Sequence, residues 1–173
     1  MKSLSRWTPA FVVGAMLVAG SSSAFAQQKG KTLKEQVVGS WTFVSAVDVS
    51  ADGGRTDRWG PDAKGIFMFD ANGRFAQFIV RSDLPKFASK KATEGTAEEN
   101  KAILKGVVGS FGTYTVNEAE KTVVTTVEGG VFPNLVGVAQ QRKIVTLNAT
   151  ELKYVNPATS TGTVAEAVWK RAK

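Results

Sequence analysis

The sequence predicts an all-β domain that contains at most eight antiparallel strands and one inserted α-helix. Short runs rich in β-branched and aromatic residues recur along the chain, and turn-forming residues separate them. Regular spacing of short strands favours a barrel or a sandwich over a parallel α/β architecture. The last run, 163–170, carries Trp169 near its end and could pair with the first run, which would close the sheet.

Residues 1–26 have the pattern of a secretory signal peptide. Lys2 and Arg6 precede an uncharged apolar run over 10–20, and small residues follow it up to Ala26. This run is shorter than the stretch of about 20 apolar residues that a membrane-spanning helix needs. We therefore expect cleavage after Ala26 and export to the periplasm.

Composition limits the chemistry that the chain can perform. It has no cysteine and no histidine, which excludes disulfides, thiolate and imidazole metal ligands, and nucleophilic sites built on these residues. The 22 Lys and Arg residues outnumber the 15 Asp and Glu residues, but the basic stretches match no nucleic-acid motif. We expect no metal, no cofactor and no nucleic-acid partner. The length left after 1–26 fits a lead-in over 27–38 and one domain over 39–173.

The first half of the domain begins with a short amphipathic turn or helix over 33–38 and a strand from about Ser40 to Val49. One face of this strand is predicted to contain Trp41, Phe43, Ser45 and Val47. The clearest hairpin follows, because two aromatic, β-rich runs over 65–69 and 74–80 flank the turn Asp70-Ala71-Asn72-Gly73.

The inserted helix begins at a capping-box pattern, in which Thr96 and Glu99 can bond to each other's backbone N–H groups. We expect about 12 residues ending near Gly109, with apolar side chains on one face. That face is predicted to contain Ile103, Leu104, Val107 and Val108. The remaining strands are predicted over 111–116, 122–127, 138–147, 151–155 and 163–170.

Gly39-Ser40-Trp41 at the start of the first strand resembles the start of a lipocalin. In that family the Trp plugs the closed end of the barrel, and a basic side chain from near the chain end packs across it. The resemblance makes Trp41 the structural plug and Lys170 or Arg171 the basic partner.

A longer series of motifs resembles the bacterial lipocalin-like domain family, a calycin-type fold, in order across nearly the whole of 39–173. The motifs are GSWTFVS (39–45), WGP (59–61), KGI (64–66), NGR (72–74), LPKFA (84–88), GTAEENK (95–101), FGTY (111–114) and VEGGVFPN (127–134). The resemblance implies an eight-stranded antiparallel up-and-down barrel with one inserted helix. Members often carry histidines before the Glu-Gly segment, where this chain has Thr125 and Thr126, so no imidazole role transfers.

Four polar residues are the candidates for orienting a ligand: Gln77, Tyr114, Glu128 and Arg142. Glu128 could accept from a ligand hydroxyl or act as a general base, but it could also pair with Arg142 or end its strand in water. Arg142 could hold a carboxylate or phosphate bidentately if its face is interior, and is solvated if that face is exterior. Tyr114 could donate to a ligand or serve as a core residue.

Aromatic residues are the candidates for the apolar walls: Phe67, Phe69, Phe75 and Phe78. They could line a pocket or fill the barrel, and an eight-stranded barrel can do both.

The favoured function is binding of a small, mostly apolar ligand in the barrel cavity, in the cell envelope, with the helix covering or bracing one opening. One alternative is a cyclase- or isomerase-like enzyme that acts on an apolar molecule, with Glu128 and Tyr114 as acid and base. Another is an envelope interaction protein whose barrel is filled. We assign no catalytic residue, because the chain lacks the histidine that most acid–base sites use.

Overall fold

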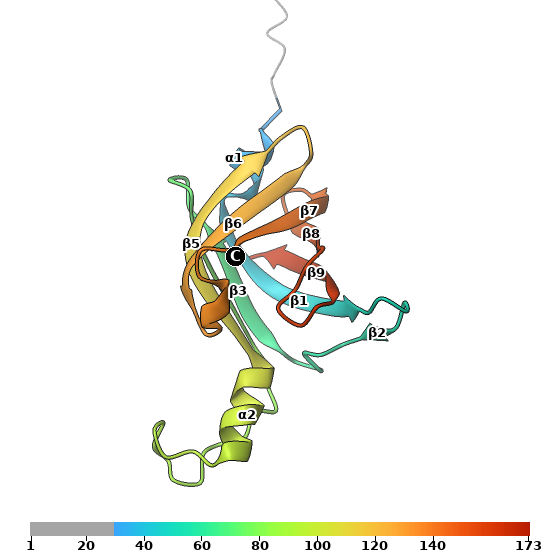
Figure 1. The fold of residues 1–173 in the computed structure, drawn as a ribbon. Helices are drawn as coiled ribbons and strands as arrows, with labels where there is room; N and C mark the ends of the chain where they lie inside the picture. The colour runs from blue at the N-terminus through green and yellow to red at the C-terminus, as the bar shows by residue number, and fades with distance from the viewer. Residues whose placement is uncertain (1–29) are drawn as a thin grey trace, which may run out of the picture.

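The computed structural model describes residues 30–173, and the predicted signal peptide lies outside the described residues. Figure 1 shows one closed barrel with a helix extending from one end. The elements in chain order are α1 (Leu33–Val37), β1 (Gly39–Val49), β2 (Arg55–Thr56), β3 (Lys64–Phe69), β4 (Arg74–Val80), α2 (Ala97–Gly106), β5 (Val107–Asn117), β6 (Thr122–Gly130), the 3-10 helix η1 (Pro133–Leu135), β7 (Ala139–Leu147), β8 (Glu151–Asn156) and β9 (Val164–Arg171).

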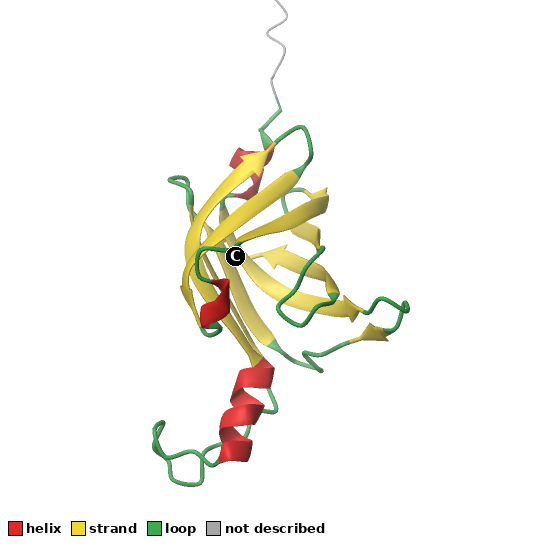
Figure 2. Ribbon diagram, in the orientation of Figure 1, coloured by secondary structure: helices red, strands yellow, loops and turns green. Residues whose placement is uncertain are grey.

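Eight of these strands form an antiparallel up-and-down barrel, as predicted (Figure 2). From β3 onward each strand pairs with the next in the chain, and β1 pairs with both β3 and β9. The closure that Trp169 suggested is confirmed, because Phe43 of β1 lies opposite Trp169 of β9. The two-residue strand β2 pairs only with the end of β1 and stands outside the barrel wall.

The predicted grouping of Trp41, Phe43, Ser45 and Val47 on one face of β1 is correct for the first half of the strand and wrong for the second. Trp41 and Phe43 are buried, but the pairing of β1 with β9 shifts register between Phe43 and Ser45. This bulge reverses the alternation, so Ala46 and Asp48 point inward where Ser45 and Val47 were expected. No glycine or proline at residues 43–45 marks the shift.

The hairpin of β3 and β4 is confirmed with its expected turn. Asp70 Oδ1 accepts from the backbone N–H of Arg74 at 2.7 Å, and Gly73 has a φ of 89°. This positive φ is the conformation that glycine adopts without steric cost, so the turn sequence sets the register of the hairpin.

Helix α2 begins as predicted but ends earlier than expected. Thr96 and Glu99 form both bonds of the capping box. The helix ends at Gly106, and Val107 is already extended. A Cβ at Gly106 would lie 2.5 Å from Leu84 Cδ2, so glycine lets the loop before α2 approach the end of the helix. Val107 and Val108 therefore belong to β5, and Leu104 is 64% exposed, so the expected apolar helix face does not pack on the barrel.

Candidate functional site

One end of the barrel is sealed around Trp41, whose side chain is fully buried. Its indole Nε1 donates to the carbonyl of Val37 at 2.8 Å, and the guanidinium of Arg171 lies over its ring with Cζ 4.1 Å from the centroid. Arg171, rather than Lys170, is thus the basic side chain that packs across the Trp. Its Nη2, Nη1 and Nε donate to the carbonyls of Gln36, Val38 and Ala149, respectively, at 2.7, 2.9 and 2.9 Å.

Gly39 is required by this arrangement for two reasons. Its φ is 126°, which L side chains rarely adopt, and a Cβ on it would lie 2.7 Å from Arg171 Nη1. The glycine and the tryptophan of the Gly-Ser-Trp motif therefore contribute to the same contact. Because Gly39 has no side chain, it leaves room for Arg171, which covers the indole of Trp41.

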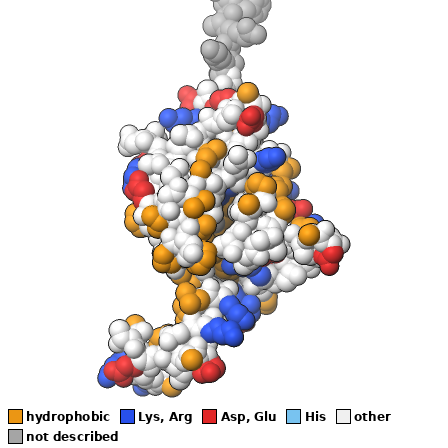
Figure 3. Space-filling view, viewed as in Figure 1, with side chains coloured by type: hydrophobic (Ala, Val, Ile, Leu, Met, Phe, Trp, Pro, Cys, Tyr) orange, Lys and Arg blue, Asp and Glu red, His pale blue; other side chains and the backbone are white. Residues whose placement is uncertain are grey.

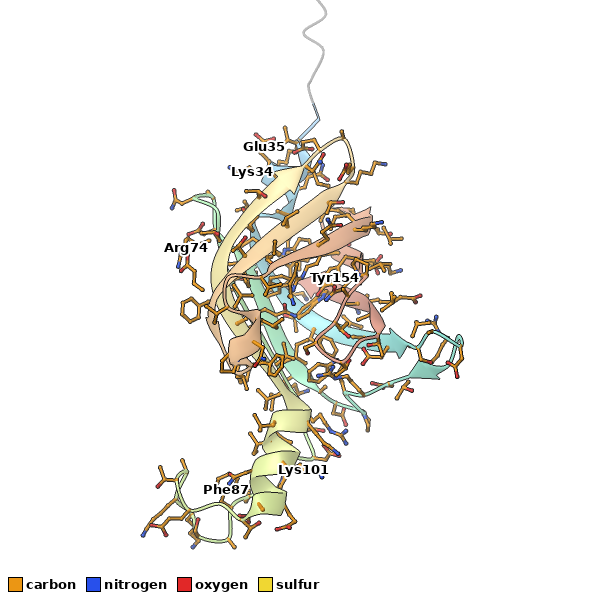
Figure 4. The ribbon with its side chains drawn as sticks, viewed as in Figure 1. Lys34, Glu35, Arg74, Phe87, Lys101 and Tyr154 are labelled. Carbon is orange, nitrogen blue, oxygen red and sulfur yellow. The ribbon has the colours of Figure 1, made fainter. Side chains whose placement is uncertain are left out.

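The short helix α1 covers this closed end, at the top of the view in Figure 4. The carboxylate of Glu118, from the turn between β5 and β6, accepts from the backbone N–H groups of Leu33 and Lys34 at 2.9 and 3.0 Å. A carboxylate is stabilised at a helix N-terminus, so this contact fixes the lead-in segment to the barrel.

Next to the plug, aromatic rings fill the barrel interior. The ring of Phe67 lies 4.2 to 6.3 Å from the rings of Phe69, Phe75, Tyr154 and Trp169, measured between centroids. All of these side chains are buried. This half of the barrel is therefore a packed core and leaves no room for a ligand.

The other half of the barrel holds a cavity of about 990 Å³ that extends to α2. Its walls include Ala46, Trp59, Ile79, Val108 and Ala167. Gln77, Arg142 and Tyr154 line it where it meets the aromatic core. Figure 4 shows Tyr154 within the barrel and Lys101 on α2 at the outer end. The helix thus borders the opening and does not cover it.

Arg142 is the polar centre of the cavity and is only 4% exposed. Its Nη1 donates to Thr125 Oγ1 at 2.6 Å, and its Nη2 donates to the side-chain oxygens of Gln77 and Gln140 at 3.2 and 3.3 Å. Its Cζ lies 5.4 Å from the ring centroid of Phe67. Within residues 30–173, its buried Nε has no hydrogen-bond partner and no carboxylate lies within 4.0 Å of the guanidinium.

The cavity wall also contains charged and aromatic residues that sequence reasoning did not assign. The carboxylate of Asp48 lies 3.7 Å from the guanidinium of Arg58, which stacks on Trp59 at 4.6 Å from the ring centroid. Trp59 belongs to the WGP motif, so the resemblance marked its position without giving its role. Asp48 was missed because the bulge in β1 has no signal in the sequence.

Glu128 does not reach the cavity. It is the extra residue of a bulge in β6, because Val127 pairs with Gly112 while Gly129 pairs with Phe111. Its half-exposed carboxylate forms a two-bond ion pair with Arg74, at 2.6 and 2.7 Å. Figure 4 shows Arg74 on the outside of the barrel wall. Glu128 therefore pairs with Arg74, and the considered pair with Arg142 is not formed.

Tyr114 lies inside the barrel but in its filled half. Its hydroxyl donates to the carbonyl of Asp70 at 2.6 Å, and its ring packs against Phe69. Burial raises the pKa of this phenol, so it remains a neutral donor. The structure thus does not bring Tyr114 and Glu128 together at the cavity as an acid and a base.

The aromatic residues that were predicted to form the walls of the cavity do not line it. Phe67, Phe69 and Phe75 point inward and belong to the packed core. Phe78 points outward and is 45% exposed, beside Ile66 on the neighbouring strand. Of the predicted ligand contacts, Gln77 and Arg142 line the cavity.

Electrostatics at the outer end of the cavity favour anions. Lys101 and Lys105 lie one turn apart on α2 and line the opening together with Arg58 and Arg81. Figure 3 shows basic side chains gathered where α2 meets the barrel. The acidic side chains in the lining are Asp48 and Asp57.

Two further features bear on the kind of site. No helix within residues 30–173 has the length and apolar character needed to cross a bilayer. The same residues contain no group of three or more His, Cys, Asp or Glu side chains placed to hold a metal ion.

The family model of the lipocalin-like domain matches residues 38–172. The chain belongs to this family. The match covers every barrel strand of this lipocalin-like protein, from β1 to β9. No curated protein sequence matches the chain.

Several solved structures are similar to this lipocalin-like protein at low identity. A lipocalin-like protein from Bacteroides uniformis has 13% identity and a TM-score of 0.43, covering 79% of this chain and 99% of that one. Bovine odorant binding protein, in complex with a selenium-containing odorant, has 15% identity and a TM-score of 0.41, covering 83% and 74%. The amine binding protein of Rhodnius prolixus, in complex with tryptamine, has 13% identity and a TM-score of 0.40, covering 79% and 63%.

Proposed function

We propose that this lipocalin-like protein binds a small, mostly apolar molecule in its barrel cavity. The observation that carries the proposal is the cavity of about 990 Å³. It adjoins the packed core, and its walls include Ala46, Trp59, Ile79 and Ala167. Ligand pockets in proteins span about 300–1,000 Å³ and combine apolar walls with a few placed polar groups. Burial of apolar ligand surface would supply the affinity.

We propose further that the protein works in the periplasm after removal of residues 1–26. The support is the charged, apolar and small-residue order of this segment. Intact mass spectrometry of the protein purified from its own envelope tests this, because cleavage after Ala26 gives a chain that begins at Gln27. A chain that retains residues 1–26 would contradict the proposal.

The binding test uses the same substitution on the two faces of the barrel wall. Ala46 lines the cavity, and Ala46→Trp would fill part of it. Ala76 points outward beside Met68 and Phe78, so Ala76→Trp is the matched control. The probe is N-phenyl-1-naphthylamine, whose fluorescence rises in apolar sites, and 1-dodecanol is the competitor.

Wild type and Ala76→Trp are expected to bind the probe and release it to 1-dodecanol, whereas Ala46→Trp is expected to bind at least about tenfold more weakly. Circular dichroism shows whether each variant is folded. Probe binding that Ala46→Trp leaves unchanged, or the absence of any binding to wild type, would overturn the proposal.

A further inference from the structure

A buried arginine without an acidic partner is the least explained group in the cavity. Burial of a cation is costly unless a counter-charge and hydrogen bonds compensate for the lost water. Arg142 is 4% exposed, and its oxygen partners among residues 30–173 are the neutral groups of Thr125, Gln77 and Gln140. Its Nε is a buried donor that has no acceptor in the described part of the chain.

The other buried charge of the cavity does not compensate for Arg142. Asp48 is 9% exposed, and its ion pair is made with Arg58 at 3.7 Å. The described part of the chain therefore leaves a positive charge uncompensated where the cavity meets the aromatic core.

We propose that the ligand carries a carboxylate, which Arg142 binds. This proposal rests on the proposed function, because it assigns the chemistry of the molecule in the same cavity. The Nε and Nη2 groups of a guanidinium lie side by side and form a fork that matches the two oxygens of a carboxylate. A carboxylate that displaces the Gln77 oxygen from Nη2 would accept from Nη2 and Nε together and would supply the missing acceptor and counter-charge.

A single carboxylate fits this position better than a phosphate. A phosphate carries up to two negative charges and more acceptor oxygens than one guanidinium and its neutral neighbours can satisfy. The apolar walls around Ile79 and Ala167 then hold the rest of the molecule. The ligand class is therefore an amphipathic monocarboxylic acid, with the acid innermost and the apolar part toward the opening.

Basic side chains at the opening agree with an acidic ligand. Lys101 and Lys105 line the outer end of the cavity, and neither forms an ion pair within the described residues. Exposed lysines of this kind raise the local concentration of anions and the rate of their entry.

The test compares three competitors of the same chain length: dodecanoic acid, 1-dodecanol and dodecylamine. Each displaces N-phenyl-1-naphthylamine from wild type, Arg142→Met, Arg142→Lys and Lys143→Met at neutral pH. We expect wild type to prefer the acid over the alcohol by roughly tenfold or more, because hydrogen bonds to charged groups are the strong ones. The amine is expected to bind most weakly.

Arg142→Met is expected to lose the preference for the acid and to keep its affinity for the alcohol. Arg142→Lys retains the charge without the fork and should keep only part of the preference. Lys143→Met removes one positive charge from the outer face of the same strand, away from the cavity lining, and should keep the preference. The wild-type comparison alone remains decisive if Arg142→Met does not fold.

Equal affinity of wild type for the acid and the alcohol would overturn the carboxylate proposal and leave the binding function standing. An acid preference that persists in a folded Arg142→Met would overturn it too. Failure of all three competitors and the probe to bind would instead overturn the binding function on which it rests.

Discussion

Arg171 at the closed end and Arg142 beside the cavity both lie over aromatic rings, but they differ in how their donors are satisfied. At the closed end, Arg171 stacks on Trp41 and donates through Nε, Nη1 and Nη2 to three backbone carbonyls. In the middle of the barrel, Arg142 lies near Phe67 and Tyr154. Its Nη2 makes longer bonds, and its Nε has no partner among residues 30–173.

All three nitrogens of Arg171 donate to backbone carbonyls, whereas Arg142 has a nitrogen with no acceptor in the described residues. The carbonyls that accept from Arg171 belong to the lead-in segment and to the turn before β8, so the guanidinium ties three parts of the chain together. Arg142 donates mainly to the side chains of Thr125, Gln77 and Gln140, and its backbone acceptor is the carbonyl of Gln140, two residues away. Arg171 on the indole of Trp41 therefore closes the barrel, whereas Arg142 near the phenyl ring of Phe67 is the side chain that we propose for ligand binding.

The largest expected effect is the loss of the plug itself. Trp41→Ala removes a fully buried indole and should lower the free energy of unfolding by about 3–5 kcal/mol. Trp59→Ala, at the cavity wall, should cost less because its ring already borders open space. Urea denaturation followed by circular dichroism measures both, and equal losses would contradict the distinction between a closed and an open half.

The two arginines themselves give the next largest effect, in a matched pair of substitutions. Arg171→Met removes a cation–π contact and three charged hydrogen bonds and should destabilise the protein by about 2–3 kcal/mol. Arg142→Met removes a buried cation without a counter-ion and should change stability by less than about 1 kcal/mol or raise it. Thermal and urea unfolding of the unliganded variants would refute the comparison if both cost the same.

The smallest expected effect comes from Tyr114, which lies in the filled half of the barrel and does not line the cavity. Tyr114→Phe removes the hydrogen bond to Asp70 and should cost about 1 kcal/mol at neutral pH. Burial raises the pKa of Tyr114, so its contribution to stability is complete below the ordinary phenol pKa of about 10 and is lost as the pH rises through the folded value.

The variant should therefore lose less stability than wild type between neutral pH and about pH 11. Unfolding free energies measured across this range check the prediction, and parallel curves for the two proteins would contradict it. Affinity for N-phenyl-1-naphthylamine should stay unchanged, because Tyr114 does not line the cavity.

The parts of the fold that depend only on residues close together in the sequence were predictable. The turn at Gly73, the capping box at Thr96 and the alternation in β4 are set by interactions within a few residues. The pairing of Phe43 with Trp169 was predictable for another reason, since a sheet of short strands removes its unpaired edges by closing.

The candidate site was predictable only in part. Arg142 and Gln77 were named, but the alternation around Arg142 left its face undecided until the pairing partners of β7 were known. The pair of Glu128 with Arg142, one of the alternatives considered, is not formed, because Glu128 follows the buried Val127 and points outward to Arg74. Gly112 has no room for a Cβ, which would lie 2.0 Å from the carbonyl oxygen of Thr126, yet a lone glycine in a strand does not announce a bulge.

The sequence by itself determined an all-β barrel of the lipocalin-like family, with Trp41 at its closed end and one capped helix at Thr96. Only the tertiary structure decided which half is filled, which side chains face the cavity and that Arg142 has no acidic partner within residues 30–173. The physical reason is that turns and caps are local, whereas the inward or outward direction of a strand residue depends on the register of every bulge between it and the turn.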